Sequence, residues 1–285
     1  MTNSVRVGLA QVTAEPYAVE RNREVAKQAV IEAFGAGADI VVLPEMIVHG
    51  YVADWRRLAP LAEPAQGPTF DEWHALAKEA GGYIVGGLCE RAGDALYNTA
   101  LAVGPEGVVL HYRKVHLFAE EKVAFRPGDL GFPVASTRFG AIGICVCYDL
   151  RFVEAVRIMA LLGADLVCVP TAWLPGFDQT RWDDEGMCPQ AHGALLQANL
   201  NQVFIACASQ AGLAGDLDFL GSSVLADPYG ARALGPFPGS ERAVQVVEID
   251  IGATKRAQVR GPLIAPRADR RTDVYGIWTA DGRIL

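Results

Sequence analysis

A strand, a helix and a second, fully apolar strand follow one another at the start of the chain, and this order constrains the fold more than any other feature. Residues 5–12 alternate in polarity and are rich in β-branched side chains, as a strand requires. Residues 22–34 place apolar side chains at helical spacing and end at a Gly-Ala-Gly stop. Residues 39–43 then form, after Asp39, a continuous apolar run up to Pro44, which is typical of a parallel strand buried on both faces. This order predicts a parallel sheet with crossover helices.

The same alternation continues through the rest of the 285 residues and predicts an α/β protein. Further helices are predicted over residues 70–80, 152–162 and 190–201. Further strands are predicted over residues 83–88, 97–103, 108–112, 141–146, 165–169, 203–208, 221–226, 231–234 and 243–249. The length suits one large α/β domain or two small ones, and the chain contains no low-complexity linker. We therefore expect a single domain over residues 1–285, with two sheets sandwiched between layers of helices.

The composition argues against several classes of partner. The net charge of −8 and the lack of a basic run with interleaved aromatic residues disfavour nucleic acid and anionic membranes as partners. The N-terminal residues lack the apolar segment of a signal peptide, and Gly, Pro or Asp interrupts the longest apolar stretches well short of a membrane span. These features predict a cytoplasmic protein.

Six cysteines occur without a C-x-x-C pair, and most of them lie inside apolar runs. This placement predicts reduced, buried thiols in preference to a disulfide framework. Only Cys145 and Cys147 are close together in the sequence, and no paired histidine lies near them. We therefore expect no metal site.

Chemically useful side chains stand just beyond the ends of four predicted strands. These residues are Glu45, Lys114, Cys147 and Trp173. Ligands of α/β sheets bind beyond the carboxyl ends of the strands, so we expect these side chains to gather at one site. A carboxylate, an ammonium group and a thiol on rigid elements would supply a base, a cation and a nucleophile.

Cys147 needs help from its neighbours to act as a nucleophile, because a free thiol is mostly protonated at neutral pH. The Lys114 ammonium group would stabilise the thiolate, and the Glu45 carboxylate could take the thiol proton and return it to the leaving amine. Lys114 and the backbone N–H of Tyr148 could also stabilise the oxyanion of a tetrahedral intermediate. These parts suit acyl transfer from nitrogen to water through a thioester.

Three segments around these residues resemble the motifs of the nitrilase superfamily of carbon–nitrogen hydrolases. They read Pro-Glu-Met at residues 44–46, Tyr-Arg-Lys-Val-His-Leu-Phe at residues 112–118 and Gly-Ile-Cys-Val-Cys-Tyr-Asp-Leu-Arg-Phe at residues 143–152. They occur in the family's order, and the resemblance covers nearly the whole chain. It implies a four-layer αββα sandwich in which Glu45 is the general base, Lys114 the oxyanion stabiliser and Cys147 the nucleophile.

The resemblance also implies a fourth catalytic residue. Residues 120–129 look like the family segment that carries a second glutamate, and Glu121 matches that position better than Glu120 does. The implied role of Glu121 is to orient the substrate amide and to hold Lys114. Taken without the resemblance, either glutamate could be a solvated loop charge.

Two other residues compete for the catalytic roles. Strand alternation turns Cys145 to the same face as Cys147, so alternation cannot separate the two thiols. Cys145 lies deeper in its predicted strand, and we interpret it as a core residue. His116 offers a Cys–His alternative, although a lone histidine is more often structural.

Aromatic residues near the strand ends are candidates for a substrate pocket, with simple aromatic packing as the alternative. The expected lining residues are Tyr51, Tyr148, Ala172 and Trp173. The loop over residues 175–189 is long and polar, and loops of this length in compact domains are usually functional or disordered. Within it, Arg181 and Trp182 could recognise a substrate carboxylate or could hold the loop in place.

The predicted function is hydrolysis of a small carboxamide to a carboxylate and ammonia through a thioester on Cys147, without a metal or organic cofactor. N-carbamoyl hydrolysis, nitrile hydrolysis and ω-amidase action use the same chemistry and stay open. Carbamoyl and ω-amide substrates predict an arginine in the pocket, for which Arg181 is the candidate, whereas a nitrile predicts an apolar pocket. A non-catalytic scaffold and an acyltransferase are further alternatives. Family members commonly associate, so we expect a homodimer or larger homo-oligomer with residues 275–278 among the contacts.

Overall fold

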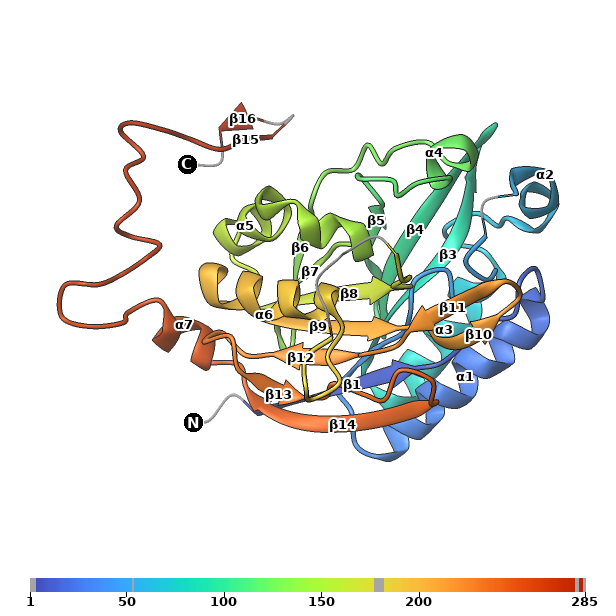
Figure 1. Cartoon of the computed structure of the whole chain (residues 1–285), viewed down its shortest axis with the longest axis horizontal. Coiled ribbons are helices and arrows are strands. Elements are labelled where there is room, and N and C mark those ends of the chain that lie inside the picture. The colour runs from blue at the N-terminus through green and yellow to red at the C-terminus, as the bar shows by residue number, and fades with distance from the viewer. Residues whose placement is uncertain (1–3, 53, 177–181, 280–281, 284–285) are drawn as a thin grey trace.

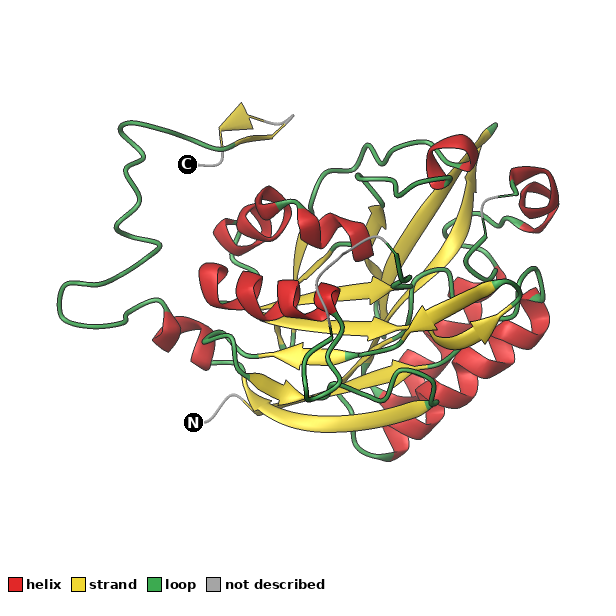
Figure 2. Cartoon of the chain, in the orientation of Figure 1, coloured by secondary structure: helices red, strands yellow, loops and turns green. Residues whose placement is uncertain are grey.

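Two six-stranded sheets pack face to face in the computed structural model, which describes residues 4–52, 54–176, 182–279 and 282–283. Helices cover the outer face of each sheet (Figure 1, Figure 2). The four-layer αββα sandwich predicted from the sequence is therefore confirmed.

The first sheet has the strand order β14-β1-β2-β3-β4-β5. Its strands are β1 (Ser4–Gln11), β2 (Ile40–Val42), β3 (Tyr83–Ala92), β4 (Ala95–Gly104), β5 (Gly107–Arg113) and β14 (Ala243–Asp250). β1, β2 and β3 are parallel neighbours, whereas β4, β5 and β14 pair in the antiparallel sense. The connecting helices α1 (Val19–Gly35) and α3 (Pro68–Ala80) pack on this sheet. All of β2 is buried, as its continuous apolar run predicts.

The second sheet has the strand order β13-β12-β9-β8-β7-β6. Its strands are β6 (Val134–Thr137), β7 (Gly140–Ile144), β8 (Leu166–Thr171), β9 (Phe204–Ser209), β12 (Val224–Ala226) and β13 (Arg232–Leu234). β7, β8 and β9 are parallel, so their carboxyl ends meet at one edge of the sheet. Helix α6 (Pro189–Asn201) packs on β9 and β12, and α5 (Val153–Leu161) packs against α6.

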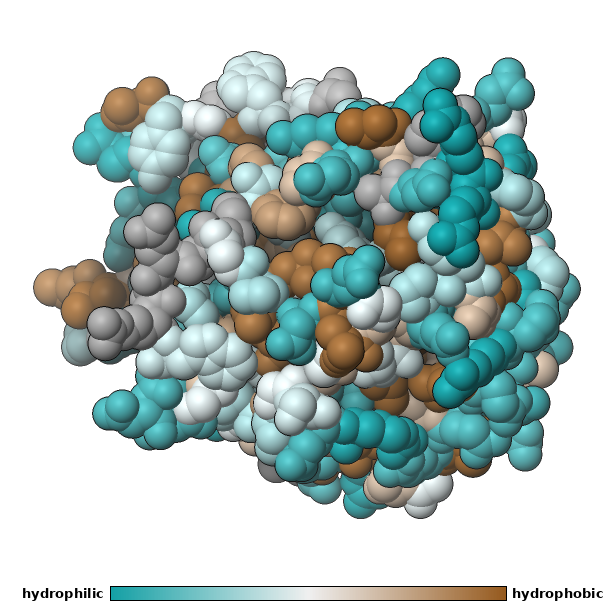
Figure 3. Space-filling model, turned by 45° about the vertical axis from the view of Figure 1, so that its right-hand side comes forward, coloured by the Kyte–Doolittle hydropathy of each residue, from teal (hydrophilic) through white to brown (hydrophobic). Residues whose placement is uncertain are grey.

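The core lies between the two sheets, where β1 contacts β9 and β2 contacts β8. Its members include Leu9, Val42, Val167 and Ile205, which are fully buried. Burial of apolar surface stabilises the fold by roughly 25 cal/mol for each Å² removed from water. On the face drawn in Figure 3, apolar side chains reach the surface in separate small groups among polar ones. A second apolar cluster lies on the other face of the first sheet, where α1 and α3 cover it.

Several short elements complete the chain. They are α2 (Trp55–Leu58), α4 (Glu121–Ala124), two 3₁₀ turns (Ala59–Leu61 and Cys147–Arg151), the hairpin strands β10 (Ala211–Ala214) and β11 (Leu217–Leu220), α7 (Ala253–Ala257), β15 (Trp278–Thr279) and β16 (Gly282–Arg283). After α7 the chain leads away from the sheets (Figure 1). Among the described residues, no helix has the length and apolar composition needed to cross a membrane.

The structure corrects some of the predicted boundaries. The strand predicted over residues 221–226 begins only at Val224, because Gly221 and Ser222 both have a φ of 60°, which is incompatible with extended pairing. Strand β6, helix α4 and the β10–β11 hairpin were not predicted. Each of the strands and the helix in these segments is only four residues long, so none contains enough residues to show a clear period.

Candidate active site

The carboxyl ends of β2, β5, β7 and β8 deliver the predicted site residues to one region of the sandwich. Glu45, Lys114, Cys147 and Ala172 lie just beyond these four strands. The ends of β2 and β8 are joined across the two sheets, since the Glu45 N–H donates to the Thr171 carbonyl oxygen at 3.3 Å. The parallel strands therefore bring residues that are far apart in the sequence next to one another.

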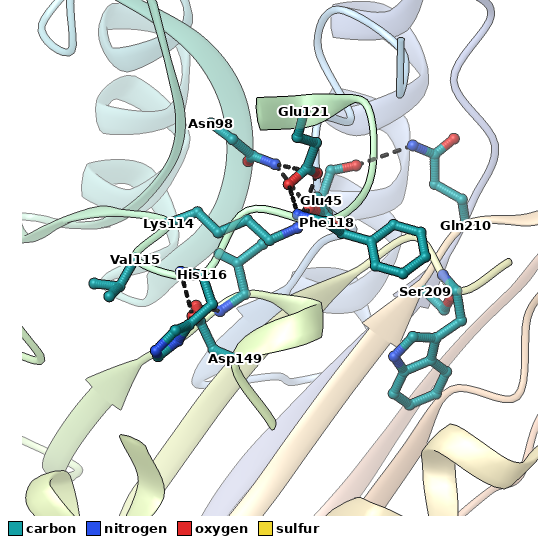
Figure 4. A network of polar contacts seen from close by, with 12 residues as sticks. Glu45, Asn98, Lys114, Val115, His116, Phe118, Glu121, Asp149, Ser209 and Gln210 are labelled. Atoms are coloured by element: carbon teal, nitrogen blue, oxygen red, sulfur yellow. Dashed lines mark hydrogen bonds and ion pairs between the residues drawn. The ribbon is translucent and has the colours of Figure 1, made fainter. Parts of the chain in front are cut away.

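Lys114 is enclosed by two carboxylates. Its Nζ donates to Glu45 Oε1 at 2.6 Å and to Glu121 Oε1 at 2.9 Å, and all three side chains are buried (Figure 4). Asn98 Nδ2 donates to the same two oxygens, at 2.7 Å and 3.1 Å. Glu120, the neighbour of Glu121, is exposed. The structure thus places Glu121, and not Glu120, beside the other two residues.

The second carboxylate oxygen of Glu45 is buried and accepts no hydrogen bond from any described residue. Burial raises the pKa of Glu45 to about 7, and the charge of Glu121 adds to this effect, whereas Lys114 and Asn98 lower it. Burial alone would lower the pKa of Lys114, but the carboxylates of Glu121 and Glu45 raise it above its ordinary value. Lys114 is therefore a permanent cation, and Glu45 is suited to acid–base chemistry near neutral pH.

Cys145 and Cys147 have different surroundings. Cys145 is fully buried in the core between the sheets. Cys147 begins a 3₁₀ turn, is partly exposed and lines a pocket. Its φ of 60° lies in the left-handed region that residues other than glycine rarely adopt, and such backbone strain clusters at active sites. These differences separate the two thiols, which strand alternation could not.

Burial is the largest influence on the pKa of the Cys147 thiol. Burial raises its pKa well above the ordinary value and the charge of Glu45 adds to this, whereas Lys114 and a hydrogen bond with the Ala172 backbone lower it. Lys114 favours the thiolate, as expected from the sequence, but burial and Glu45 outweigh it. A thiol with a raised pKa needs a nearby base before it can act as a nucleophile.

All four predicted pocket residues line one cavity beside Cys147. The cavity has a volume of about 480 Å³, counting the space that is open to solvent. Its walls include Tyr51, Tyr148, Ala172, Trp173, Phe118 and Leu174. Arg151 and Gln190 are also among the residues that line this mainly apolar cavity. Arg181, the other predicted contact, lies outside the described residues, and Trp182 is partly exposed at 42%.

Comparison with known proteins decides the family to which this site belongs. The model of the carbon-nitrogen hydrolase family matches residues 6–258. The chain belongs to the carbon–nitrogen hydrolases of the nitrilase superfamily. A nitrilase from Pyrococcus abyssi is 34% identical to it over 274 residues, which cover 95% of this chain and 99% of that protein. An (R)-stereoselective amidase from Pseudomonas sp. is 32% identical over 222 residues, which cover 77% of this chain and 76% of that protein.

Solved structures of an amidase from Nesterenkonia sp. AN1 are similar to this carbon–nitrogen hydrolase. One of them has a TM-score of 0.75 and 27% identity, and the match covers 95% of each chain. It is a Glu-to-Gln variant that carries the acetamide moiety of fluoroacetamide on its active-site cysteine. Another variant of the same amidase was solved in complex with acrylamide. Small amides and their analogues are therefore ligands of a protein with this fold.

His116 of this carbon–nitrogen hydrolase has structural partners. Its Nδ1 lies 2.7 Å from Asp149 Oδ1, and its ring stacks on Phe152 with the ring centroids 3.5 Å apart. Asp149 also accepts a hydrogen bond from the Tyr112 hydroxyl at 2.6 Å. These contacts fix the turn that begins at Cys147, which favours the structural interpretation of His116. Within the described part of the chain, no group of three His, Cys, Asp or Glu side chains could hold a metal ion.

Asn98 and Gln210 are two buried amide residues at the site that were not predicted from the sequence. Asn98 bridges the two glutamates from β4. Gln210 Nε2 donates to the Glu45 carbonyl oxygen at 2.9 Å, and Gln210 Oε1 accepts from the Ala14 N–H at 3.1 Å. The available signal was a polar amide inside or directly after an apolar strand, because a buried amide requires specific partners.

His49 holds the turn that connects Glu45 with Tyr51. The Cys89 N–H donates to His49 Nδ1 at 3.0 Å, so Nε2 carries the ring proton and donates to the Leu61 carbonyl oxygen at 3.1 Å. His49 is fully buried, and this burial lowers its pKa below the ordinary value. The fold therefore requires the neutral ring.

We expect the contribution of His49 to the free energy of unfolding to fall as the pH drops below the ordinary histidine pKa of 6.5, whereas protonation of Glu45, whose pKa is raised, acts in the opposite sense. Because folding lowers the pKa of His49, the unfolded chain takes up the proton first, and acid favours unfolding. One such proton gives a slope of about 1.4 kcal/mol per pH unit. Urea unfolding at several pH values should show a smaller slope for His49→Gln than for the wild type. His74→Gln, at a half-buried histidine of α3, is the control for replacing a histidine by glutamine elsewhere in the chain. Equal slopes for His49→Gln and the wild type would contradict this expectation.

Proposed function

We propose that the protein hydrolyses small carboxamides to carboxylates and ammonia through a thioester on Cys147. The observation that carries this proposal is the Cys147 thiol in a mainly apolar pocket, where the charge of Glu45 raises the pKa of the thiol. The second carboxylate oxygen of Glu45, Oε2, has no hydrogen-bond partner among the described residues. The amidase and nitrilase relatives support the same reaction class.

The first half of the proposed reaction forms the thioester. Cys147 Sγ attacks the carbonyl carbon, and Glu45 Oε2 accepts the thiol proton. Lys114 Nζ carries three hydrogens, and its bonds to Glu45 and Glu121 leave the third for the oxygen of the tetrahedral intermediate. Glu45 then gives the proton to the nitrogen, the C–N bond breaks, and ammonia leaves.

The second half releases the acid. A water molecule gives one proton to Glu45 and attacks the thioester carbon. The C–S bond breaks, the carboxylic acid forms, and the proton on Glu45 returns to the Cys147 sulfur. The site is then ready for the next amide.

We expect kcat/KM to fall on the acid side of about pH 7. The carboxylate form of Glu45 is needed as the base, and burial raises its pKa to about 7. The rate should therefore decrease about tenfold for each pH unit below that value. Initial rates of ammonia release across the pH range test this, with unfolding monitored in the same buffers. A rate that stays constant down to the ordinary glutamate pKa would contradict it.

A substrate with a distal carboxylate is the second candidate, because Arg151 lies in the pocket lining. N-carbamoyl amino acids and ω-amides carry such a group, and a guanidinium binds a carboxylate through two parallel hydrogen bonds. Phe118, Trp173 and Leu174 suit an uncharged, apolar acyl group. Arg151→Gln should raise KM for carboxylate-bearing amides and leave KM for aliphatic amides unchanged if the second candidate is correct.

Ammonia release from a panel of amides, carbamoyl compounds and nitriles tests the proposed function. We expect turnover of at least one amide and, after acid quenching, a mass increase on Cys147 that equals the acyl group. Turnover of nitriles alone would make the protein a nitrilase. A panel without product or adduct would count against hydrolysis and favour a scaffold or an acyltransferase.

We further propose that residues 1–285 act as one domain that assembles into a homodimer or larger homo-oligomer. The chain after α7 leads away from the sheets (Figure 1) and exposes large apolar side chains, with Leu263 at 94%, Val274 at 70% and Trp278 at 69%. Apolar groups exposed to this extent favour contact with another protein surface. Removing the residues after 258 should lower the mass measured by analytical ultracentrifugation. An unchanged mass would exclude this segment from the contact.

A further inference from the structure

The four carboxylate oxygens of Glu45 and Glu121 are not equivalent. Glu45 Oε1 and Glu121 Oε1 each accept hydrogen bonds from Lys114 Nζ and Asn98 Nδ2. Glu121 Oε2 accepts from the Phe118 N–H at 2.8 Å. Glu45 Oε2 is buried and accepts none from the residues that the structure describes. The contacts of the other three oxygens thus leave one atom of Glu45 available for proton transfer.

Asn98 contacts three members of this cluster from one position in β4. Its Nδ2 bridges Glu45 and Glu121 (Figure 4), and its main-chain oxygen accepts from the Lys114 N–H at 2.8 Å. The side chain is buried, and Oδ1 has no partner among the described residues. Leaving a buried amide oxygen unpaired is unfavourable. Turning the amide over would be worse, because Oδ1 would then face two carboxylate oxygens.

We propose that Asn98 is a positioning residue, which bridges Glu45 and Glu121 through their Oε1 atoms and thereby leaves Glu45 Oε2 available for proton transfer with the Cys147 thiol. This inference rests on the function proposed above. An amide suits the role because it donates two hydrogens without adding charge. Aspartate at this position would place a third carboxylate in the cluster, and alanine would remove both bonds.

The bridge also affects the charge of Glu45. The Asn98 hydrogen bond lowers the pKa of Glu45, in opposition to burial. Without this bond, a larger fraction of Glu45 would be protonated at neutral pH, and less would be available to take the thiol proton. Where Glu45 acts as the base, the pH at which Cys147 becomes reactive should therefore move upward, which a residue with a merely structural role would not cause. A neutral Glu45 also ceases to raise the pKa of Cys147, and this effect opposes the rise.

The rate at which iodoacetamide alkylates Cys147, measured by mass spectrometry across the pH range, tests this inference without requiring turnover. The variants are Asn98→Ala and the isosteric Asn98→Asp. Thr99→Val is the matched control, because Thr99 is the next residue of β4, is equally buried, and donates to Glu90 Oε2 at 2.6 Å outside the cluster. Circular dichroism shows whether each variant is folded, and Asn98→Asp decides alone if Asn98→Ala does not fold.

We expect the pH at which the alkylation rate is half-maximal, the alkylation midpoint, to rise by about one half to one pH unit in Asn98→Ala. The rate below the midpoint should then fall by about three- to tenfold. Asn98→Asp should show a larger rise, and Thr99→Val none. Midpoints equal to the wild type in the folded Asn98 variants, or an equal rise in Thr99→Val, would overturn the inference.

The same experiment separates this inference from the proposed function. A raised midpoint in a protein that hydrolyses no amide would overturn the proposed function and retain the role of Asn98 toward Cys147. Amide hydrolysis with an unchanged midpoint would overturn the role of Asn98 and retain the function.

Discussion

Replacement of Cys147 by alanine should reduce the rate of amide hydrolysis by about 10⁴-fold or more, because a thioester cannot form without the sulfur. The fold should survive, since Cys147 is partly exposed and belongs to a turn held by Asp149 and its partners. Ammonia release and the mass of the acid-quenched protein measure the two expected losses, of turnover and of the acyl adduct.

Cys145→Ala is the matched control for this variant. Cys145 is two residues away and is fully buried in the core, so its replacement should lower stability and leave the adduct on Cys147 intact. Removing a small buried group typically costs about 1 kcal/mol. Loss of turnover in Cys145→Ala, together with full activity in Cys147→Ala, would reverse the assignment of the nucleophile.

Replacement of Lys114 by methionine should abolish turnover and also destabilise the protein. The change leaves Glu45 and Glu121 buried beside each other without the cation that both of them contact. Breaking a buried ion pair by removing one partner typically costs about 3–5 kcal/mol. Urea unfolding and ammonia release measure the two effects, and Lys78→Met, at an exposed lysine of α3, provides the control.

The double variant Lys114→Met, Glu45→Gln separates the effect of unpaired buried charge on stability from the effect of the substitution on activity. In this variant only one buried carboxylate, that of Glu121, is left without its cation. The variant should therefore recover part of the lost stability and none of the activity. The coupling free energy between the two positions should be on the order of 1–3 kcal/mol, as for residues in one buried network. A Lys114→Met variant that is as stable and as active as the wild type would remove Lys114 from the proposed mechanism.

The layers of the fold could be predicted from the sequence because buried parallel strands have a distinctive composition. The run at residues 39–43 contains only side chains that suit a strand covered on both faces, apart from its first residue, and β2 lies there. The ends of such strands then indicated Glu45, Lys114 and Cys147. The resemblance to a family added Glu121, which no strand end indicated.

The contacts within the site could not be predicted in the same way. Asn98 faces the two glutamates because of its register in β4, and a strand pattern does not show which polar residue meets which partner. Gln210 reaches Glu45 from the other sheet, so its role depends on how the sheets are packed. The raised pKa of the Cys147 thiol likewise depends on burial that only the assembled fold provides.

The use of Glu45 Oε2 in both halves of the proposed reaction fixes the order in which ammonia leaves and water enters. In the proposed reaction this oxygen gives a proton to the departing nitrogen and later takes one from the incoming water, so both molecules must approach the same atom. Ammonia therefore has to leave before water can enter. Ammonia or hydroxylamine supplied from outside would occupy the position of the water, and would capture the acyl group from Cys147 in competition with hydrolysis.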